Sequence, residues 1–338
     1  MASTALVTGA TGYLGSELVK QLLQKGFIVH ATVRSPDNTK AVQHLTNLAD
    51  ALPGTLKLFK ADLLHPKAFD ESIKGCQYVF HTASPFIIEV EDPQRDLIDP
   101  AVKGTSNVLS SVAKHKKFVK RTIVTSSVAA VLGNESAVPP KNESLYTEDD
   151  WNETSSIKNN EAYWLSKASA EREAWKIAKE HDLDLVTILP NFILGPALSR
   201  HDTKGLSVGF MKACLESDTI AGTPVITDVR DVAKAHILAA TLPEAKGRYI
   251  ISNRKPITPR LVSDILQARF PHLQIPTGKQ EAAPEKIDNS KAAKELGLQL
   301  TTVNETLVDM ALVQDICQST HKKQQNSVDQ RKLLVCAA

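Results

Sequence analysis

The stretch VTGATGYLG, Val7–Gly15, places three glycines between two segments of different character. Ala5–Thr8 is short and apolar, as expected for a buried strand, and Ser16–Gln24 carries leucines along one side, as expected for a helix. A strand, a glycine turn and a helix in this order open a βαβ unit. The turn therefore predicts an α/β fold that starts at the N-terminus.

The same alternation continues along the chain. Short segments rich in Val and Ile predict further strands at Ile28–Val33, Leu56–Ala61, Gln77–Ala83, Thr122–Ser126, Leu185–Leu189, Val225–Thr227 and Arg248–Ile251. Helices are predicted at Pro66–Ile73, Val102–His115, Glu161–His181 and Val232–Thr241. Strands that alternate with helices predict a doubly wound parallel sheet of the Rossmann type, covered on both faces.

Composition excludes several classes of partner. The chain has 338 residues, of which 42% are hydrophobic and 23% charged, and its net charge of +2 gives no reason to expect nucleic acid or a membrane surface. Its four cysteines lie far apart, which argues against a disulfide framework and against a metal site. The N-terminus lacks the pattern of a secretory signal, so a cytoplasmic location is expected.

The three glycines have separate physical roles in such a turn. Gly9 allows a tight turn, Gly12 lets the backbone approach a pyrophosphate, and Gly15 lets the helix pack closely on the sheet. The phosphates would lie at the helix N-terminus, where N–H groups and the helix dipole favour anions. We expect a dinucleotide here; the alternative is a glycine turn that holds no ligand.

The end of the second strand indicates which dinucleotide. NAD enzymes commonly have an acidic residue there, about 20 residues after the turn, to bind the ribose hydroxyls. This chain has Arg34 instead, with Lys40 nearby. An arginine can hold a 2′-phosphate with two hydrogen bonds, whereas a carboxylate would repel it. NADPH/NADP+ is therefore the expected cofactor, unless Arg34 is only a solvated surface residue.

A tyrosine and a lysine lie four residues apart in EAYWLSK. Tyr163 and Lys167 would share one face of a helix, and Ser127 follows the fifth strand at the carboxyl edge of the sheet. Carbonyl reduction requires hydride on carbon and a proton on oxygen; NADPH carries the hydride and Tyr163 would give the proton. We expect Lys167 to lower the phenol pKa, which is near ~10 in water. Ser127 would donate a hydrogen bond to the carbonyl oxygen.

The GxxGxxG spacing and these three residues resemble the extended short-chain dehydrogenase/reductase superfamily. Further stretches resemble its family of dihydroflavonol, cinnamoyl-CoA and yeast-type methylglyoxal (aldehyde or ketone) reductases, over most of the chain from residue 4 to about 310. They are HTASPF (His81–Phe86), RDLIDPAVKGTSNVL (Arg95–Leu109), TSSVAAV (Thr125–Val131), LPNFILGP (Leu189–Pro196) and DVRDVAKAHI (Asp228–Ile237).

The resemblance implies roles for individual residues. Asp62 would bind the adenine amino group, or else only form a turn. Asn107 would orient Lys167 through water, or else act as a helix cap or a polar core residue. The full set of implied cofactor contacts is Gly9, Thr11, Gly12, Tyr13, Leu14, Arg34, Lys40, Asp62, Leu63, Thr82, Ala83, Ser84, Thr125, Ser126, Lys167, Pro190 and Ile193.

Departures from the family's sequence patterns narrow the range of expected substrates. Cinnamoyl-CoA reductases have Asn-Trp-Tyr-Cys-Tyr-Gly-Lys where this chain has NEAYWLSK, and dihydroflavonol reductases have Asn where this chain has Leu132. An apolar pocket for a medium-sized aldehyde or ketone is therefore expected. The predicted lining residues, each of which could instead be ordinary core, are Phe86, Val128, Leu132 and Phe192.

Other activities on this fold stay open. A phenylpropanoid or flavonoid substrate is the first alternative. A hydroxysteroid dehydrogenase or sugar-nucleotide epimerase is the second, although Arg34 argues against an NAD-binding epimerase. A non-catalytic NADP sensor is the third, and the presence of Ser127, Tyr163 and Lys167 argues against it.

The second half of the chain predicts the domain organisation. Residues 1–190 would form the NADP-binding domain, with 225–252 returning to it. Residues 191–224 and 253–320 would form a smaller, mostly helical substrate-binding region, and 321–338 a loose tail. In DVRDVAKAHI we expect Asp231 to cap a helix and Arg230 to pair with an acid. A monomer or a homodimer is expected.

Overall fold

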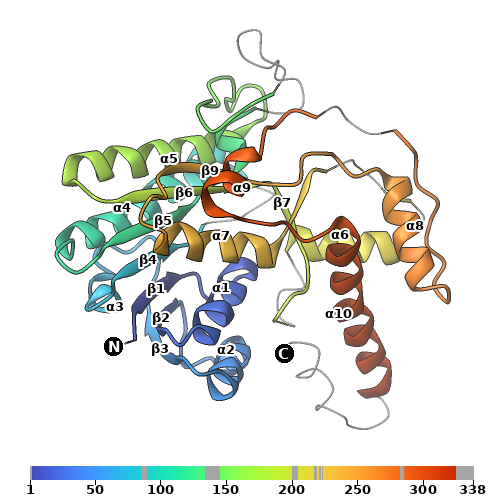
Figure 1. Ribbon diagram of the computed structural model, residues 1–338, viewed down its shortest axis with the longest axis horizontal. Coiled ribbons are helices and arrows are strands. Elements are labelled where there is room, and N and C mark those ends of the chain that lie inside the picture. Colours follow the sequence, from blue (N-terminus) through green and yellow to red (C-terminus); the bar gives the residue numbers. More distant parts are fainter. Residues whose placement is uncertain are drawn as a thin grey trace.

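A computed structural model describes residues 2–84, 90–133, 145–199, 205–216, 219–220, 222, 224–281 and 285–324, with side chains described up to residue 314. Its centre is a seven-stranded parallel sheet with the strand order β3-β2-β1-β4-β5-β6-β9 (Figure 1). The strands are β1 (Thr4–Thr8), β2 (Ile28–Val33), β3 (Thr55–Lys60), β4 (Tyr78–His81), β5 (Arg121–Thr125), β6 (Leu185–Pro190) and β9 (Gly247–Ile251). The order reverses between β1 and β4, which opens a crevice at their carboxyl ends.

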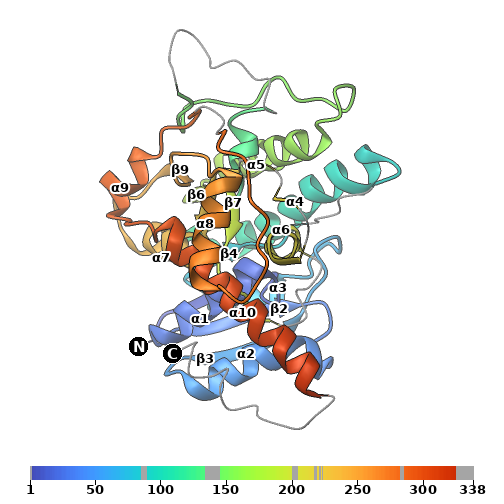
Figure 2. The ribbon, with the colours of Figure 1, turned by 90° about the vertical axis from the view of Figure 1, so that its right-hand side faces the viewer.

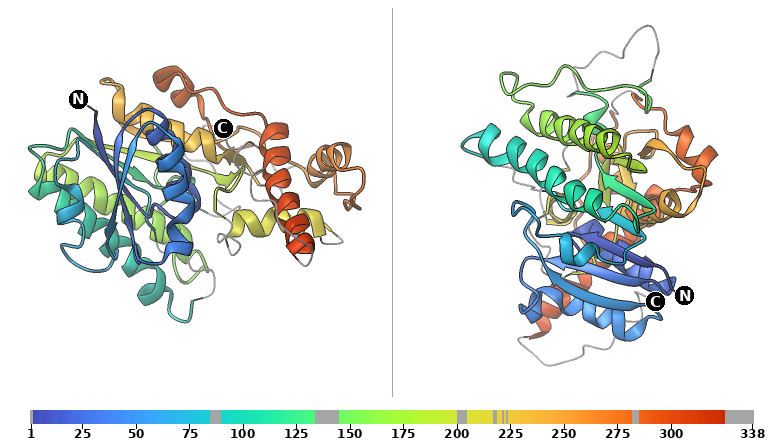
Figure 3. Two further views of the ribbon diagram at one scale, coloured as in Figure 1. Left: turned by 90° about the horizontal axis from the view of Figure 1, so that it is seen from below. Right: turned by 90° about the vertical axis from the view of Figure 1, so that its left-hand side faces the viewer.

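Helices cover both faces of this sheet, as two views in Figure 3 show. One face carries α1 (Tyr13–Gln24), α2 (Thr39–Ala51) and α7 (Val229–Thr241). The other face carries α3 (Asp70–Ile73), α4 (Asp99–Lys114) and α5 (Ala162–His181). Apart from the edge strand β3, whose residues are exposed or half-buried, the strands are buried on both sides, which explains their nearly continuous apolar sequences.

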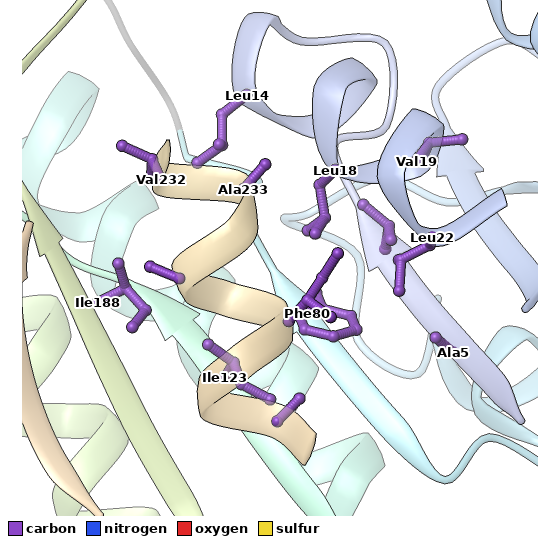
Figure 4. Close-up of a cluster of buried hydrophobic side chains, with 14 of the residues drawn as sticks. Ala5, Leu14, Leu18, Val19, Leu22, Phe80, Ile123, Ile188, Val232 and Ala233 are labelled. Carbon is purple, nitrogen blue, oxygen red and sulfur yellow. The ribbon is translucent and has the colours of Figure 1, made fainter. Parts of the chain in front are cut away.

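The main core lies where α1 and α7 meet over the sheet (Figure 4). Leu18 of α1 and Val232 of α7 are fully buried, together with Phe80 of β4 and Ile123 of β5. Burial of such side chains contributes roughly 1.5–3 kcal/mol each. This core fixes α1, and with it the glycine turn, against the strands that carry the candidate site.

The C-terminal part forms a second cluster beside the sheet. A two-stranded parallel sheet of β7 (Phe192–Leu194) and β8 (Ile226–Asp228) packs with three helices (Figure 2). They are α6 (Leu206–Glu216), α8 (Pro259–Arg269) and α10 (Val303–Gln324). The short helix α9 (Ser290–Leu296) instead packs on the main core. Among the described residues, no helix is both long and apolar enough to cross a membrane.

The predicted fold class is confirmed, and the structure corrects several element boundaries. Helix α3 starts at Asp70 rather than Pro66, because Lys67 adopts φ +64°, which no helix continues through. Helix α2 and strand β7 were not predicted. Helix α10 runs to Gln324, so the first residues of the predicted tail belong to a helix.

The start of α7 also differs from the prediction. Asp228, not Asp231, is the N-cap: its backbone is extended and its carboxylate accepts from the Arg230 N–H. Asp231 instead accepts hydrogen bonds from the backbone and the hydroxyl of Thr301. The predicted pairing of Arg230 is confirmed, with Asp228 and Asp309 as its partners. The division into domains stays a prediction.

Candidate active site

The glycine turn is shaped by close backbone packing. Gly9 has φ +67°, and a Cβ there would lie 2.9 Å from the Ala83 Cα. A Cβ on Gly15 would lie 2.3 Å from the Gly9 carbonyl oxygen. The Gly12 N–H donates to that same oxygen over 2.9 Å. Larger side chains at Gly9 and Gly15 are therefore excluded by sterics.

This turn delivers the N-terminus of α1 to the carboxyl edge of the sheet. Gly12 is the N-cap residue and is exposed, and no side chain caps the helix. The N–H groups of the first turn and the helix dipole then favour an anion at this point. A cradle that a Cβ would fill, ending in an uncapped helix, fits the pyrophosphate of a dinucleotide.

Arg34 and Lys40 lie beyond the end of β2, and both are exposed. Within the described part of the chain, neither side chain takes part in an ion pair. Two uncommitted cations beside the turn fit the 2′-phosphate of NADPH. Their assignment to this phosphate stays a prediction.

The segment after β3 carries two further residues of the expected cofactor set, Asp62 and Leu63. Asp62 accepts a hydrogen bond of 2.9 Å from the Leu64 N–H, so it does form a turn. Asn107 donates 2.9 Å to the Leu63 carbonyl oxygen. Asn107 thus holds the 62–64 turn, and among the described residues no hydrogen bond joins it to Lys167.

The end of β4 is tied to the end of β1. The Thr82 hydroxyl donates to the Thr8 carbonyl oxygen (2.6 Å), and the Ala83 N–H donates to the Thr8 hydroxyl (3.1 Å). The same hydroxyl lies 2.9 Å from His81 Nδ1. These bonds fix the two strand ends at which the order of the sheet reverses.

The catalytic candidates converge at this edge. Tyr163 and Lys167 lie one turn apart on α5, with the Lys167 Nζ 5.5 Å from the centre of the tyrosine ring. Tyr163 forms a side-chain hydrogen bond with Ser127, which lies two residues after the end of β5 and caps the 3₁₀ helix η2 (Val128–Ala130). Lys167 donates 2.8 Å to the Ser84 hydroxyl. The structure therefore brings Ser127, Tyr163, Lys167 and Ser84 together, while their catalytic roles stay predictions.

Similarity to known proteins agrees with this arrangement. Residues 5–253 match the model of the NAD dependent epimerase/dehydratase family. The chain belongs to this family. It is 40% identical over 315 residues to a cinnamoyl-CoA reductase of Medicago truncatula, with 89% of this chain and 92% of that protein covered. It is 36% identical over 310 residues to an anthocyanidin reductase of Vitis vinifera, with 86% and 89% covered.

A solved structure of the family is also similar. Yeast methylglyoxal/isovaleraldehyde reductase Gre2, complexed with NADPH, superposes with a TM-score of 0.80 at 30% identity, covering 93% of this chain and 99% of that chain. The predictions of an extended short-chain dehydrogenase/reductase and of an NADP-dependent oxidoreductase are confirmed.

Burial sets the protonation of the family's tyrosine and lysine here. Burial raises the pKa of Tyr163, and only its hydrogen bond with Ser127 opposes this. Burial also lowers the pKa of Lys167 to about 8. Contrary to the expectation, the phenol pKa is raised rather than lowered in this structure, because desolvation is the larger effect. The ammonium of Lys167 lies over the ring and donates its hydrogen bond to Ser84.

Some expected cofactor contacts have side chains engaged elsewhere. The Thr125 hydroxyl lies 2.7 Å from Nε2 of His236, on the α7 side of the sheet. The Ser126 hydroxyl donates 2.7 Å to Glu171 of α5. Both hydroxyls therefore have partners within the protein, and contact of Thr125 and Ser126 with the cofactor stays a prediction.

Three further residues of the expected cofactor set lie near the glycine turn. Thr11 is half-buried, and Leu14 is buried in the main core. The Tyr13 hydroxyl donates to the Gly195 carbonyl oxygen, which joins the turn to the segment after β7. Pro190 ends β6, and Ile193 lies in β7 against the main core.

The predicted substrate residues lie in two separate hydrophobic clusters. Val128 and Leu132 pack against a small buried cluster that includes Leu189 and Ile250. Phe192 packs edge to face with Phe210, ring centres 5.6 Å apart, in the C-terminal cluster. Phe86 lies outside the described residues. A substrate-lining role for these side chains stays a prediction.

Sequence reasoning missed the buried polar groups next to the catalytic set. Glu171 and Arg248 form a buried ion pair of 2.8 Å beneath Ser126, and His81 and His236 are buried beside Thr8 and Thr125. A sequence signal exists for Glu171, because Tyr163, Lys167 and Glu171 recur every four residues along one helix. Arg248 could be noticed as a charge within an apolar strand.

Proposed function

We propose that the chain reduces an aldehyde or ketone to an alcohol, with NADPH as the hydride donor and Tyr163 as the proton donor. The observation that carries this proposal is the hydrogen-bonded convergence of Ser127 and Tyr163, with Lys167 beside them, at the sheet edge next to the glycine turn. When bound, NADPH supplies the hydride. The turn residues, Arg34 and Lys40 would hold it.

Tyr163 is the proton donor in this proposal. Its raised pKa keeps the phenol protonated at neutral pH, as a general acid for reduction requires. Ser127 Oγ accepts a hydrogen bond of 3.2 Å from the Ala129 N–H, and the proton of its hydroxyl, which faces Tyr163 in this structure, would turn to the substrate oxygen when a carbonyl binds. That proton would stabilise negative charge on the substrate oxygen.

Lys167 orients the site as a cation. Its ammonium donates to Ser84 and lies over the Tyr163 ring, so it holds α5 against the segment that follows β4. Its pKa of about 8 leaves it mostly charged at neutral pH. The family resemblance implies a further bond to the nicotinamide ribose.

A phenylpropanoid or flavonoid carbonyl is the second candidate substrate. It is favoured by the 40% and 36% identity to a cinnamoyl-CoA reductase and an anthocyanidin reductase. Against a polyhydroxylated flavonoid, Leu132 packs in an apolar cluster and offers no hydrogen bond. A cytoplasmic location and a monomer or homodimer remain part of the proposal.

The decisive experiment follows NADPH oxidation against a panel of carbonyl compounds. The panel contains methylglyoxal, aliphatic diketones, benzaldehydes, cinnamaldehydes, cinnamoyl-CoA, a dihydroflavonol and a flavanone, each repeated with NADH. Turnover of simple carbonyls with NADPH supports the first candidate, and turnover of a thioester or flavonoid alone supports the second. Tight NADPH binding with no turnover of any compound would contradict both.

A further inference from the structure

A buried ion pair lies directly behind the catalytic candidates. Glu171 of α5 is 1% exposed and Arg248 of β9 is 6% exposed, and their side chains meet through two hydrogen bonds of 2.8 and 3.1 Å. Isolated charges are rarely left at such depth, since desolvation is costly. Neither charge takes part in the proposed proton or hydride transfer.

The carboxylate of Glu171 ties α5 to two strands. It accepts a hydrogen bond of 2.7 Å from the hydroxyl of Ser126, directly after β5, and one of 2.8 Å from the hydroxyl of Thr187 in β6. Ser126 directly precedes Ser127, and Glu171 lies two turns after Tyr163 on the same helix. One carboxylate therefore links the backbone that carries the catalytic serine to the helix that carries the catalytic tyrosine.

The guanidinium of Arg248 extends this link to the other side of Ser127. Besides Glu171, it donates to the carbonyl oxygens of Ala130, Glu148 and Asp150. Ala130 ends the 3₁₀ helix that Ser127 caps. All five N–H groups of the arginine are used, and a lysine, with three donors and no planar fork, could not replace them.

An aromatic ring closes the arrangement. The Arg248 guanidinium lies 3.9 Å from the centre of the Trp151 ring, and Arg172 of α5 lies 4.7 Å from the same centre. Trp151 belongs to the segment that leads into α5, so its contact with Arg248 also fixes the position of that segment. Ser127, η2, the segment before α5 and α5 itself thus share one buried anchor.

We propose that Glu171 and Arg248 are positioning residues, which set the distance between the Ser127 hydroxyl and the Tyr163 phenol. The inference rests on the proposed function, because that pair is where the reaction would occur. We expect both residues to act through Ser127 and Tyr163 rather than by touching substrate or cofactor. Hydrogen bonds between catalytic groups tolerate little displacement, and a shift of about 1 Å can cost about 100-fold in rate.

The chain contains a matched control at the opposite end of β5. Arg121 is 9% exposed, pairs with Asp184 over 2.9 Å, and donates to the carbonyl oxygens of Ala239, Leu242 and Pro243. It anchors strands and α7 as Arg248 anchors the site, but it lies at the amino edge of the sheet. Loss of this pair should affect stability without moving Ser127 or Tyr163.

The test compares two double variants of the full chain, Glu171→Gln/Arg248→Met and Arg121→Met/Asp184→Asn. Each removes an ion pair without leaving a buried unpaired charge. We expect the first to lower kcat at least about tenfold while KM for the carbonyl and Kd for NADPH change less than about twofold. We expect the second to keep kcat within about twofold of the parent, whatever its melting temperature. An unchanged kcat in the first variant, or an equal loss in the second, would overturn the inference.

Two additions make the result decisive. If the first variant does not fold, Arg248→Lys keeps a cation beside Glu171 and should still lower kcat, and parental kcat in that variant overturns the inference. If the parent turns over no carbonyl, the pKa of Tyr163 can be measured directly by NMR titration of protein with ring-labelled tyrosines. The Tyr163 signal is assigned as the one that is missing in Tyr163→Phe. A Tyr163 pKa that moves in the first variant alone supports the inference although the proposed function has failed; an unmoved pKa overturns it.

Discussion

The ammonium group of Lys167 donates a hydrogen bond of 2.8 Å to the hydroxyl of Ser84, across the carboxyl edge of the sheet. Burial lowers the pKa of this lysine to about 8, whereas burial raises the pKa of Tyr163. As the pH rises, Lys167 is therefore the first of the two groups to lose its proton. The charged form that orients the site is the form present below about pH 8.

The pH dependence of reduction should follow Lys167. We expect kcat/KM for the carbonyl, at saturating NADPH, to be constant at neutral pH and to fall as the pH passes about 8. In Lys167→Arg the guanidinium stays charged, so the alkaline fall should disappear even though the rate itself is reduced. A parent profile that stays flat through and above pH 8 would contradict this assignment.

Removal of the Tyr163 hydroxyl should remove turnover and little else. Tyr163→Phe keeps the ring that packs beside Lys167 but cannot donate a proton, so kcat should fall by about 100- to 10,000-fold. NADPH affinity, measured by fluorescence titration, should stay near that of the parent. Tyr78→Phe, at the amino end of β4, removes a phenol far from the site and serves as the control. Normal turnover in Tyr163→Phe would eliminate the mechanism.

Arg34 should decide between the two dinucleotides. Arg34→Asp replaces an exposed cation by an anion that repels a 2′-phosphate, so Kd for NADPH should rise at least about tenfold more than Kd for NADH. Lys25→Asp makes the same charge change at the far end of α1 and should affect both cofactors equally. Equal losses for NADPH and NADH in Arg34→Asp would mean that this arginine does not bind the phosphate.

Gly9 should not tolerate a methyl group. In Gly9→Ala the alanine would have to adopt a φ of +67°, and its Cβ would lie only 2.9 Å from the Ala83 Cα. Gly26→Ala shares the positive φ, at +76°, but has nothing within 4 Å. Denaturant unfolding should show a loss of about 1–3 kcal/mol for the Gly26 variant and at least about 1 kcal/mol more for the Gly9 variant. Similar losses in the two variants would show that the approach of Ala83 is not limiting.

Local sequence patterns were sufficient to predict the strands of the sheet and to place Tyr163 and Lys167 side by side on one helix. The strand Ile28–Val33 has the predicted bounds, because a short segment rich in β-branched residues and almost fully buried favours a strand. Tyr163 and Lys167 share a helix face because helical spacing alone brings residues four apart together. The predicted helix that ends at Ile73 is longer than the observed one, because the amino-acid sequence does not show that Lys67 adopts a left-handed backbone conformation.

What the sequence by itself determined is the order of strands and helices, the glycine turn, and the residue types that stand at the carboxyl edge of the sheet. Only the tertiary structure decided what those residues meet. It joined Lys167 to Ser84, Ser126 to Glu171, and Glu171 to Arg248, which lie far apart along the chain. It also decided that Tyr163 has a raised pKa, because desolvation depends on how completely distant segments enclose a side chain, and no local pattern encodes that enclosure.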